Sequence, residues 1–425
     1  MTDASPDAAP PGRPSLADLA RVFGRIGLLS FGGPAAQIAL MHRELVAERP
    51  WLTEAEYLRA LSFCMLLPGP EAMQLATFAG WRLGGWRGAL LGGGLFVLPG
   101  AVVIFALAFA YGALTDLAWV QALLLGIKAT VVVIVAEAVL RMARRALTEP
   151  AHWALAALAF VALFAFATPF PLVVLAAALW GLLRPAAPRD AGPPPLRAGP
   201  FLLVVAGGVA LWLAPVALAW AAGDRFLVEL GLFFARLAAV SFGGAYAVLA
   251  YMAQEVVGDY GWVSAPQLMD ALGLAEATPG PLILVTAFVG ILAGLDQSGP
   301  GLGALGGLMT LWVTFVPSFL FILALAPLVE WVAGQPRLGN ALHAITAAVV
   351  GVILNLSVWF ALHVLFGRVG TLGALPWPDW SSLQPAALGL TLVAAWLLLG
   401  RRAGMLPTLG AVAGLALLLH LAGLS

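Results

Sequence analysis

The chain has 425 residues, of which 62% are hydrophobic and only 10% are charged, and its formal net charge is zero. A soluble globular domain carries roughly 25% charged residues, so this composition indicates a polytopic membrane protein, and nothing in the charge indicates nucleic-acid binding. The single cysteine, Cys64, excludes an internal disulfide and a cysteine-based metal cluster, and the five histidines lack metal-ligand spacing. We therefore expect neither a cofactor nor a metal.

The polar, Pro-rich residues 1–14 are expected to form a disordered cytoplasmic tail, because no charged segment precedes an apolar core as in a signal peptide. Apolar stretches that approach or exceed the roughly 20 residues needed to span a bilayer begin at residue 86. We expect spanning helices at about 86–112, 117–141, 151–167, 171–183, 201–222, 303–327, 338–366, 383–400 and 405–423.

Shorter helical pieces occur in two groups of four. We expect them at 16–30, 35–48, 54–67 and 71–82, and again at 226–241, 246–258, 264–277 and 282–294. At 1.5 Å per residue each piece reaches only roughly 20–24 Å, which is short of a full crossing. Between the groups, the Arg- and Pro-rich stretch 184–200 is expected to be a cytoplasmic linker, followed by a linking transmembrane helix at 201–222.

The two halves of the chain carry the same motifs in the same register. SFGG at 30–33 returns 211 residues later at 241–244, and PGP at 68–70 returns at 279–281 with the same offset. The offset also pairs residues of one type: Arg25 with Arg236, Met41 with Met252, Glu44 with Glu255, and Trp51 with Trp262. This ungapped register predicts a duplication, with repeats at 15–183 and 225–423.

Arginine placement predicts that the repeats have inverted topology. Cytoplasmic loops are enriched in Lys and Arg, and arginines cluster at 141–145, at 184–197 and at 401–402. If all three clusters are cytoplasmic, the first repeat begins on the cytoplasmic side of the membrane and the second begins on the outer side. The N-terminus is then cytoplasmic and the C-terminus lies outside.

The motifs themselves predict where the short helices turn. Pro interrupts a helix and Gly permits unusual dihedrals, so re-entrant hairpins would turn at FGG and at PGP. Non-helical backbone at membrane depth persists only where it is buried in protein or lines a wet cavity. The sequence thus predicts an all-α polytopic membrane protein with two inverted-topology repeats whose broken helices meet near the midplane, where free N–H groups favour an anion.

These motifs resemble those of the chromate ion transporter family in its long, two-domain form. The resemblance rests on FGRIGLLSFGGPAAQIALMHRELV at 23–46, LPGPEAMQLATFAG at 67–80 and FARLAAVSFGGAYAVLAYMAQEVV at 234–257. It covers essentially the whole chain. The resemblance implies a secondary active carrier in the cell inner membrane that exports chromate, with sulfate as the natural analogue, using the proton-motive force. It implies no enzyme activity.

Arg25 and Arg236 are the first candidates for substrate contact, because each sits about a turn before its SFGG motif. An arginine within the membrane is costly and usually functional, and a planar guanidinium suits a tetrahedral oxyanion. The alternative is that each arginine forms a structural pair with Glu44 or Glu255, or extends to the interface. We expect the two arginines to converge near the midplane with the PGP turns.

The motif residues are further candidates for substrate binding, although the glycines could serve helix packing and the prolines tight turns. They are Gly32, Gly33, Pro68, Gly69, Pro70 and Gln74 in the first half, and Gly243, Gly244, Thr278, Pro279, Gly280 and Pro281 in the second. Gln74, one turn into its helix, could donate a hydrogen bond to an oxyanion, whereas its counterpart Val285 cannot. Lys128 and Glu137 lie half a turn out of phase, so Glu137 is expected to pair with Arg141.

Acidic residues beside the motifs are candidates for proton coupling. Glu71 and Glu276 flank the PGP motifs where members of the family often carry Asn or Gln, so they either exchange protons or signal a different substrate. Glu44 and Glu255 are the other two candidates. The expected partners are a small inorganic oxyanion and the lipid bilayer, and oligomer formation is left open. A carrier or channel for another small anion is the alternative function. A membrane enzyme is disfavoured because HExxH and GxSxG are absent.

Overall fold

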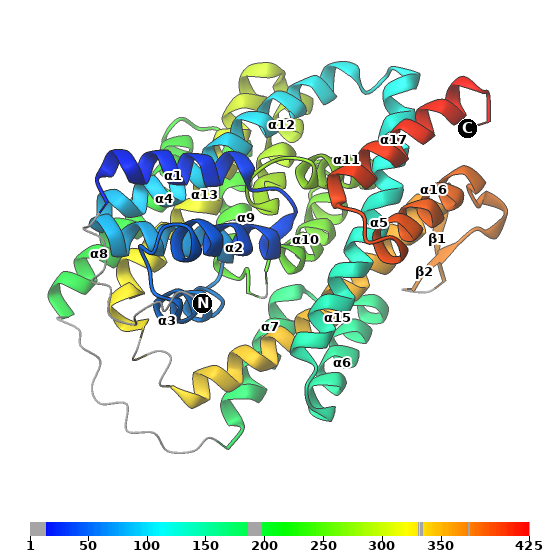
Figure 1. Ribbon diagram of the computed structural model, residues 1–425. Coiled ribbons are helices and arrows are strands. Elements are labelled where there is room, and N and C mark those ends of the chain that lie inside the picture. The colour runs from blue at the N-terminus through cyan, green and yellow to red at the C-terminus, as the bar shows by residue number, and fades with distance from the viewer. Residues whose placement is uncertain are drawn as a thin grey trace, which may run out of the picture.

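The computed structural model describes residues 14–185, 198–242, 244–329, 331, 335–372 and 375–424, and most of these lie in helices (Figure 1). Five helices in this part of the chain are long and apolar enough to cross a membrane, and further apolar helices of 10–17 residues accompany them. The prediction of an all-α membrane protein is confirmed. Most of the predicted N-terminal tail, most of the predicted linker, and Gly243 lie outside the described residues.

The first half contains seven helices, and a turn of π-helix, η1, extends the second of them. Their bounds are α1 (Leu16–Leu29), α2 (Gly33–His42), η1 (Arg43–Ala47), α3 (Glu54–Cys64), α4 (Glu71–Leu114), α5 (Ala118–Ala146), α6 (Pro150–Phe166) and α7 (Phe170–Leu183). Local sequence explains several starts. The Ser15 hydroxyl accepts from the Asp18 amide to cap α1, and Thr53 and Glu56 form a capping box on α3.

The linking helix α8 (Ala198–Ala221) leads into a second half in which this order recurs. Its elements are α9 (Arg225–Ala239), α10 (Ala245–Ala253), the π-helical η2 (Gln254–Asp259), α11 (Ala265–Glu276), the 3₁₀ turn η3 (Leu282–Leu284), α12 (Val285–Ser298), α13 (Pro300–Leu325), the 3₁₀ turn η4 (Ala326–Leu328), α15 (Pro336–Leu365), α16 (Pro385–Ala395), the π-helical η6 (Trp396–Gly400) and α17 (Met405–Leu421). The recurrence extends to detail. The π-helical turns begin 211 residues apart, and α11 carries its own capping box from Ser264 and Gln267.

Glycine explains how the predicted short helix at 71–82 joins the predicted span at 86–112. The two form one element, α4, with non-helical dihedrals at Gly84 and at Gly85, whose φ is 63°. In the second half Gly299, with φ 81°, separates α12 from α13 at the corresponding place. Gly85 and Gly299 both have a positive φ, a backbone conformation that other residues rarely adopt.

Two sequence expectations need correction. The short helix expected at 282–294 continues to Ser298, so Asp296 lies in the last turn of α12. The helix expected to end at 141 continues to Ala146 and ends at a Leu147 cap, so Arg141, Arg144 and Arg145 belong to its last two turns. No Gly or Pro lies between residues 141 and 146 to stop the helix earlier.

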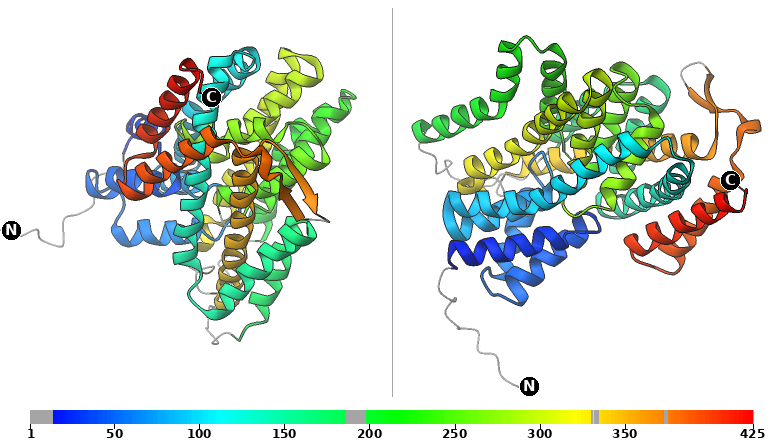
Figure 2. Two further views of the ribbon diagram at one scale, coloured as in Figure 1. Left: turned by 90° about the vertical axis from the view of Figure 1, so that its right-hand side faces the viewer. Right: turned by 90° about the horizontal axis from the view of Figure 1, so that it is seen from above.

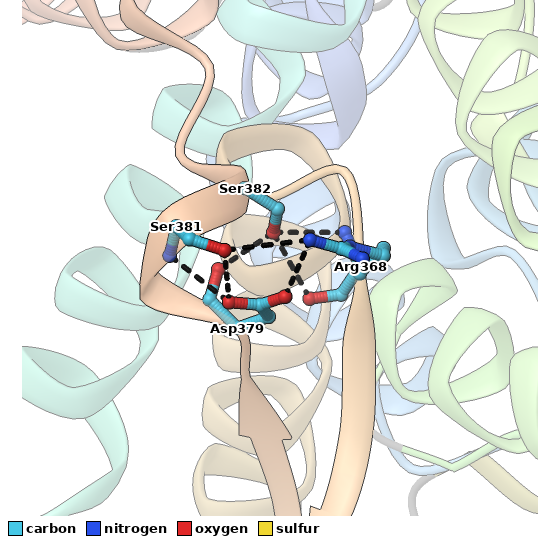
Figure 3. A network of polar contacts seen from close by, with 4 residues as sticks. All are labelled: Arg368, Asp379, Ser381 and Ser382. Carbon is cyan, nitrogen blue, oxygen red and sulfur yellow. Dashed lines mark hydrogen bonds and ion pairs between the residues drawn. The ribbon is translucent and has the colours of Figure 1, made fainter.

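A short β-hairpin between α15 and α16 was not predicted. Strands β1 (Val369–Leu372) and β2 (Leu375–Pro378) pair antiparallel, with Gly370 opposite Trp377. A polar network closes the base of the hairpin (Figure 3): Arg368 Nη2 lies 2.8 Å from Asp379 Oδ2, and Ser381 Oγ donates to Asp379 Oδ1 at 2.6 Å. The 3₁₀ turn η5 (Trp380–Ser382) follows. The prolines in β2 hid this hairpin, because Pro cannot donate to a strand ladder.

The two halves exchange helices. In the first exchange, α6 and α7 pack against α15 of the second half; in the reverse exchange, α16 and α17 pack against α5 of the first half. Helices α5 and α15 also pack against each other at the centre. The linking helix α8 packs on α9 and α13 at the edge of the molecule, where Figure 2 shows it in green. The halves therefore form one interlocked body, with α5 and α15 as its shared core.

Candidate functional site

The SFGG motif of each half contacts the PGP motif of the other half. The Gly280 N–H donates to the Ser30 carbonyl at 2.9 Å, and the Gly69 N–H donates to the Ser241 carbonyl at 3.0 Å. Ser30 and Ser241 are both buried. These two reciprocal hydrogen bonds join residues that lie 250 positions (280 − 30) and 172 positions (241 − 69) apart, and each holds the SFGG motif of one half against the PGP motif of the other.

The kinked helices α4 and α13 close around these turns. Gly100, which follows Pro99 in α4, lies so close to the Pro279 carbonyl that a Cβ would overlap it. At the matched position of α13, the Ser318 hydroxyl lies against Gly69, whose φ is 121°. Each PGP turn is therefore enclosed by the Pro-containing helix of the other half, and only glycine permits the approach at 69 and at 100.

Two buried glutamines hold the turns. Gln37 Nε2 donates to the Gly280 carbonyl at 2.6 Å and to the Ser30 carbonyl at 3.1 Å, and Gln74 Nε2 donates to the Pro68 carbonyl at 2.6 Å. Both Oε1 atoms are buried without a hydrogen-bond partner among the described residues. The Gln74 amide N–H that the sequence suggested as an oxyanion donor thus donates to the Pro68 carbonyl of the turn. The Gln74 atom left without a described partner is Oε1, which is an acceptor.

A cavity of about 530 Å³ lies beside the motifs. Gly69 and Glu71 line it from the first PGP turn and the start of α4, Pro34 from the first FGG motif, and Gly244 and Tyr246 from the second. The remaining lining residues that carry polar side chains come from α3, α5, α6, α15 and the α5–α6 connection: Ser62, Cys64, Arg141, Arg145, Thr148, His152, His343 and Thr346. The cavity therefore contacts broken-helix segments of both halves.

The wall formed by α5 is cationic. Arg141 and Arg145 lie four residues apart and so project from the same face of the helix. Arg141 Nη2 forms the expected ion pair with Glu137 Oε1 at 3.2 Å. Arg145 forms no salt bridge within the described ranges and lines the cavity together with Glu71, with which its charge interacts. His152 and His343 add two imidazoles from α6 and α15.

The two arginines singled out from the sequence lie elsewhere. Arg25 Nε is 3.6 Å from Glu44 Oε1, and Arg49 Nη1 is 2.6 Å from Glu44 Oε2, so the fully buried Glu44 carboxylate has two cationic partners. Arg236 Nη2 instead donates to the Tyr260 hydroxyl at 3.0 Å. Neither arginine lines the cavity. In the first half, Arg25 thus pairs with Glu44, which is the alternative to substrate contact that the sequence left open.

The acidic candidates divide between cavity and core. Glu71 lines the cavity. Glu276 is buried and accepts a 2.6 Å hydrogen bond from the hydroxyl of Tyr246, which itself lines the cavity. Thr278 donates to the Ala275 carbonyl and so completes its own turn. Glu71 therefore contacts the cavity directly, whereas Glu276 is connected to it through its hydrogen bond with Tyr246.

The sequence placed Arg141 and Arg145 at the cytoplasmic end of a helix, and paired Arg141 with Glu137, but did not indicate either arginine as a site residue. His152, His343 and Tyr246 were also not indicated. Glu137, Arg141 and Arg145 follow one another at intervals of four residues. This spacing was the sequence signal that the two arginines share one face of the helix. No pattern in the sequence brings α6 and α15 to that face. The exchange of helices between the halves does so.

Comparison with known proteins gives consistent matches. The sequence profile of the chromate transporter family matches residues 17–182 and 228–423. The chain is 34% identical to the chromate transport protein of Pseudomonas aeruginosa, over 83% of this chain and 82% of that protein. It is 31% identical to a probable chromate transport protein of Synechococcus elongatus (80% and 83% covered) and 30% identical to the chromate transport protein of Cupriavidus metallidurans (80% and 81% covered). No solved structure matches the chain significantly.

Proposed function

The chain belongs to the chromate transporter family, and we propose that it is a secondary active carrier that exports chromate or a similar divalent oxyanion from the cytoplasm. The observation that carries this proposal is the cationic cavity that contacts the broken-helix motifs of both halves. In inverted-repeat carriers the substrate site is built from such broken helices, where half-helix N-termini face anionic groups.

The cavity offers two kinds of group to a dianion. Arg145, free of ion pairs among the described side chains, and Arg141 would supply charge-assisted hydrogen bonds to tetrahedral oxygens. Helix α4 begins at Glu71 on the cavity wall, and no side chain caps its first N–H groups. Those N–H groups and the positive end of the helix dipole would add further donors. Arg145 would supply the positive charge that has no salt bridge among the described side chains, whereas Arg141 shares its charge with Glu137.

In this proposal Arg25 is a structural residue that holds α1 to the π-helical turn through Glu44, and the substrate is bound by the α5 arginines and the motif backbone. Arg236 has the equivalent position in the second half. Of the FGG and PGP residues, Gly69 and Gly244 line the cavity and keep their proposed role in shaping its wall. The other motif residues are proposed to hold the turns that position these two.

Transport direction and coupling follow from charge placement. Arg141, Arg144 and Arg145 at one end of α5 favour a cytoplasmic location for that end. The cavity would then open to the cytoplasm, where an exported substrate binds, with the N-terminus inside and the C-terminus outside. Glu71 and Glu276 are the proposed proton-exchanging groups, because one lines the cavity and the other is hydrogen-bonded to the cavity residue Tyr246.

The test is uptake of chromate into inverted membrane vesicles, competed by sulfate, molybdate and phosphate. Arg145→Gln is the informative variant and Arg144→Gln its matched control, because Arg144 neighbours Arg145 but does not line the cavity. A charge-assisted hydrogen bond contributes roughly 1.5–3 kcal/mol, so we expect Arg145→Gln to weaken apparent affinity about tenfold to hundredfold. The control should transport normally. Equal transport by both variants at equal abundance would overturn the site, and flux without saturation or counterflow would identify a channel.

A further inference from the structure

The internal repeat matches residues that line the cavity with residues of other helices in the opposite half of the chain. The Pro99 and Pro317 kinks match at an offset of 218 residues, and α5 and α15 begin 218 residues apart. Thr346 of α15 lines the cavity, and its counterpart in α5 is Lys128. Ser62 of α3 lines the opposite wall, and at the offset of 211 its counterpart in α11 is Gly273. The region that matches the cavity therefore lies between α5 and α11.

Helices α5 and α11 pack directly against each other in that region. A Cβ added at Gly273 would overlap the Ile127 side chain and would lie 3.2 Å from a methyl group of Val131. Gly273 is buried. On the other side of the molecule, the matched residues Ser62 and Thr346 both face the open cavity. Sequence-matched helix pairs are thus separated on one side and in contact on the other.

A buried ion pair joins the packed helices. Lys128 Nζ, in the only lysine of the chain, lies 3.4 Å from Asp270 Oδ1, and the two side chains are 19% and 4% exposed. The Tyr111 hydroxyl of α4 donates to Asp270 Oδ2 at 3.0 Å. At the matched positions of the open side stand Thr346 and Arg59, which cannot form such a pair. The pair is therefore specific to the packed side.

We propose that a second anion-accessible cavity, matched to the first, is closed between α5 and α11, and that Lys128, Asp270 and Tyr111 form the latch that keeps it closed. This inference rests on the proposed function, because a carrier must present its site to both membrane faces in turn. When the helices part, the Lys128 ammonium loses its carboxylate and faces the new cavity. It would then supply there the positive charge that Arg145 supplies in the first cavity.

The effect of substitutions follows from the cost of a lone buried charge. Removing one partner of a buried pair leaves the other charge uncompensated, which disfavours the packed arrangement. Asp270→Asn leaves the Lys128 ammonium without a counter-ion and so should favour separation of α11 from α5. Tyr111→Phe removes only one hydrogen bond and should have the same effect more weakly. The control is Glu149→Gln, which breaks the exposed ion pair between Arg184 and Glu149.

The experiment measures access to Ile127, which is half-buried and lies against Gly273. Cys64→Ser removes the native thiol, Ile127→Cys introduces a reporter, and the purified protein reacts with a charged maleimide in detergent without any substrate. We expect Asp270→Asn to speed the reaction about tenfold, because the labelling rate follows the fraction of molecules with α5 and α11 apart and we expect that fraction to rise about tenfold. We expect Tyr111→Phe to speed it less, and Glu149→Gln to leave it unchanged. All variants are first compared for monodispersity and thermal unfolding.

An unchanged or slower reaction in a folded Asp270→Asn variant would overturn the latch. Because no substrate is present, the result does not depend on which anion is carried. Faster labelling together with absent oxyanion transport by the wild-type protein would contradict the proposed function and leave the latch supported. Normal oxyanion transport by the wild-type protein, with unchanged labelling in both Asp270→Asn and Tyr111→Phe, would overturn the latch and leave the proposed function supported.

Discussion

The two sides of the molecule match in sequence but differ in packing. On one side α3 and α15 face each other across a cavity of about 530 Å³, and on the other the matched α11 and α5 lie in contact through Gly273 and Ile127. The charges differ too, because Arg141 and Arg145 on the open side match Trp359 and His363. The comparison indicates that the duplicated architecture accommodates both arrangements. Under the proposed function, the charged residues decide which side binds the anion.

The largest effect is expected at the contact between α4 and the second PGP turn. Gly100→Ala would place a Cβ against the Pro279 carbonyl, and overpacking of this kind costs about 1–3 kcal/mol of unfolding free energy. Thermal unfolding of the purified protein, together with vesicle transport, measures the loss. Gly94→Ala in the same helix is the control, because a Cβ there meets open space. Equal stability of the two variants would show that this close approach is not needed.

The next effect concerns proton coupling on the open side. Glu276→Gln keeps an oxygen that accepts from the Tyr246 hydroxyl but removes a group that can exchange a proton. We expect chromate transport in vesicles to lose most of its dependence on an imposed pH gradient, while substrate counterflow continues. Glu149→Gln, at an exposed carboxylate, is the control. A Glu276→Gln protein with the wild-type response to the gradient would move the coupling role to Glu71.

A smaller effect should distinguish the two halves at their matched arginines. Arg25 shares the buried Glu44 carboxylate with Arg49, whereas Arg236 donates to the Tyr260 hydroxyl and forms no salt bridge among the described residues. Arg25→Ala should therefore lower the unfolding temperature more than Arg236→Ala does, although Arg49 still neutralises Glu44 and limits the loss to about 1 kcal/mol. Transport per folded molecule should stay near wild type in both. A stable Arg25→Lys variant that fails to transport would restore Arg25 as a substrate ligand.

The smallest effect is expected at the hairpin, which has no counterpart in the first half. Hydrogen bonds from Ser381 hold the pKa of Asp379 below its usual value, so its ionised form stabilises the hairpin base. That contribution is present above the unfolded-state pKa and disappears as the pH falls through the lower folded-state pKa. The thermal unfolding difference between wild type and Asp379→Asn should therefore vanish at acidic pH. A difference that persists there would exclude ionisation of Asp379 as its cause.

Much of the fold was predictable because local signals agree with the repeat. Pro-Gly-Pro and SFGG marked real breaks, and the glycines at 84–85 and at 299 interrupt helices between the predicted short pieces and the predicted spans that follow them. The repeat offset placed the capping boxes at Thr53 and Ser264 in matching positions. Such signals are local, because backbone dihedrals and the first turn of a helix depend on a few neighbouring residues.

The candidate site was less predictable because its residues meet only through packing between the halves. Nothing near Lys128 in the sequence indicates Asp270, which lies on α11 of the other half. The same is true of His343, which reaches the cavity because α15 crosses to the helices of the first half. For Arg25 the sequence indicated the partner Glu44 but not the second cation at Arg49, which also pairs with that buried carboxylate.

The central claim, that the two matched sides alternate between separated and packed, is tested most directly by distances between pairs of spin labels. One pair spans the cavity at Ser62 and Thr346, and the other marks the packed side at Gln121 of α5 and Gln267 of α11, both in a Cys64→Ser background. Distances are measured by pulsed electron paramagnetic resonance with and without saturating chromate under a pH gradient. The account predicts that a population with a shorter Ser62–Thr346 distance appears together with a longer Gln121–Gln267 distance. Distances that stay fixed during transport, or that lengthen together, would contradict it.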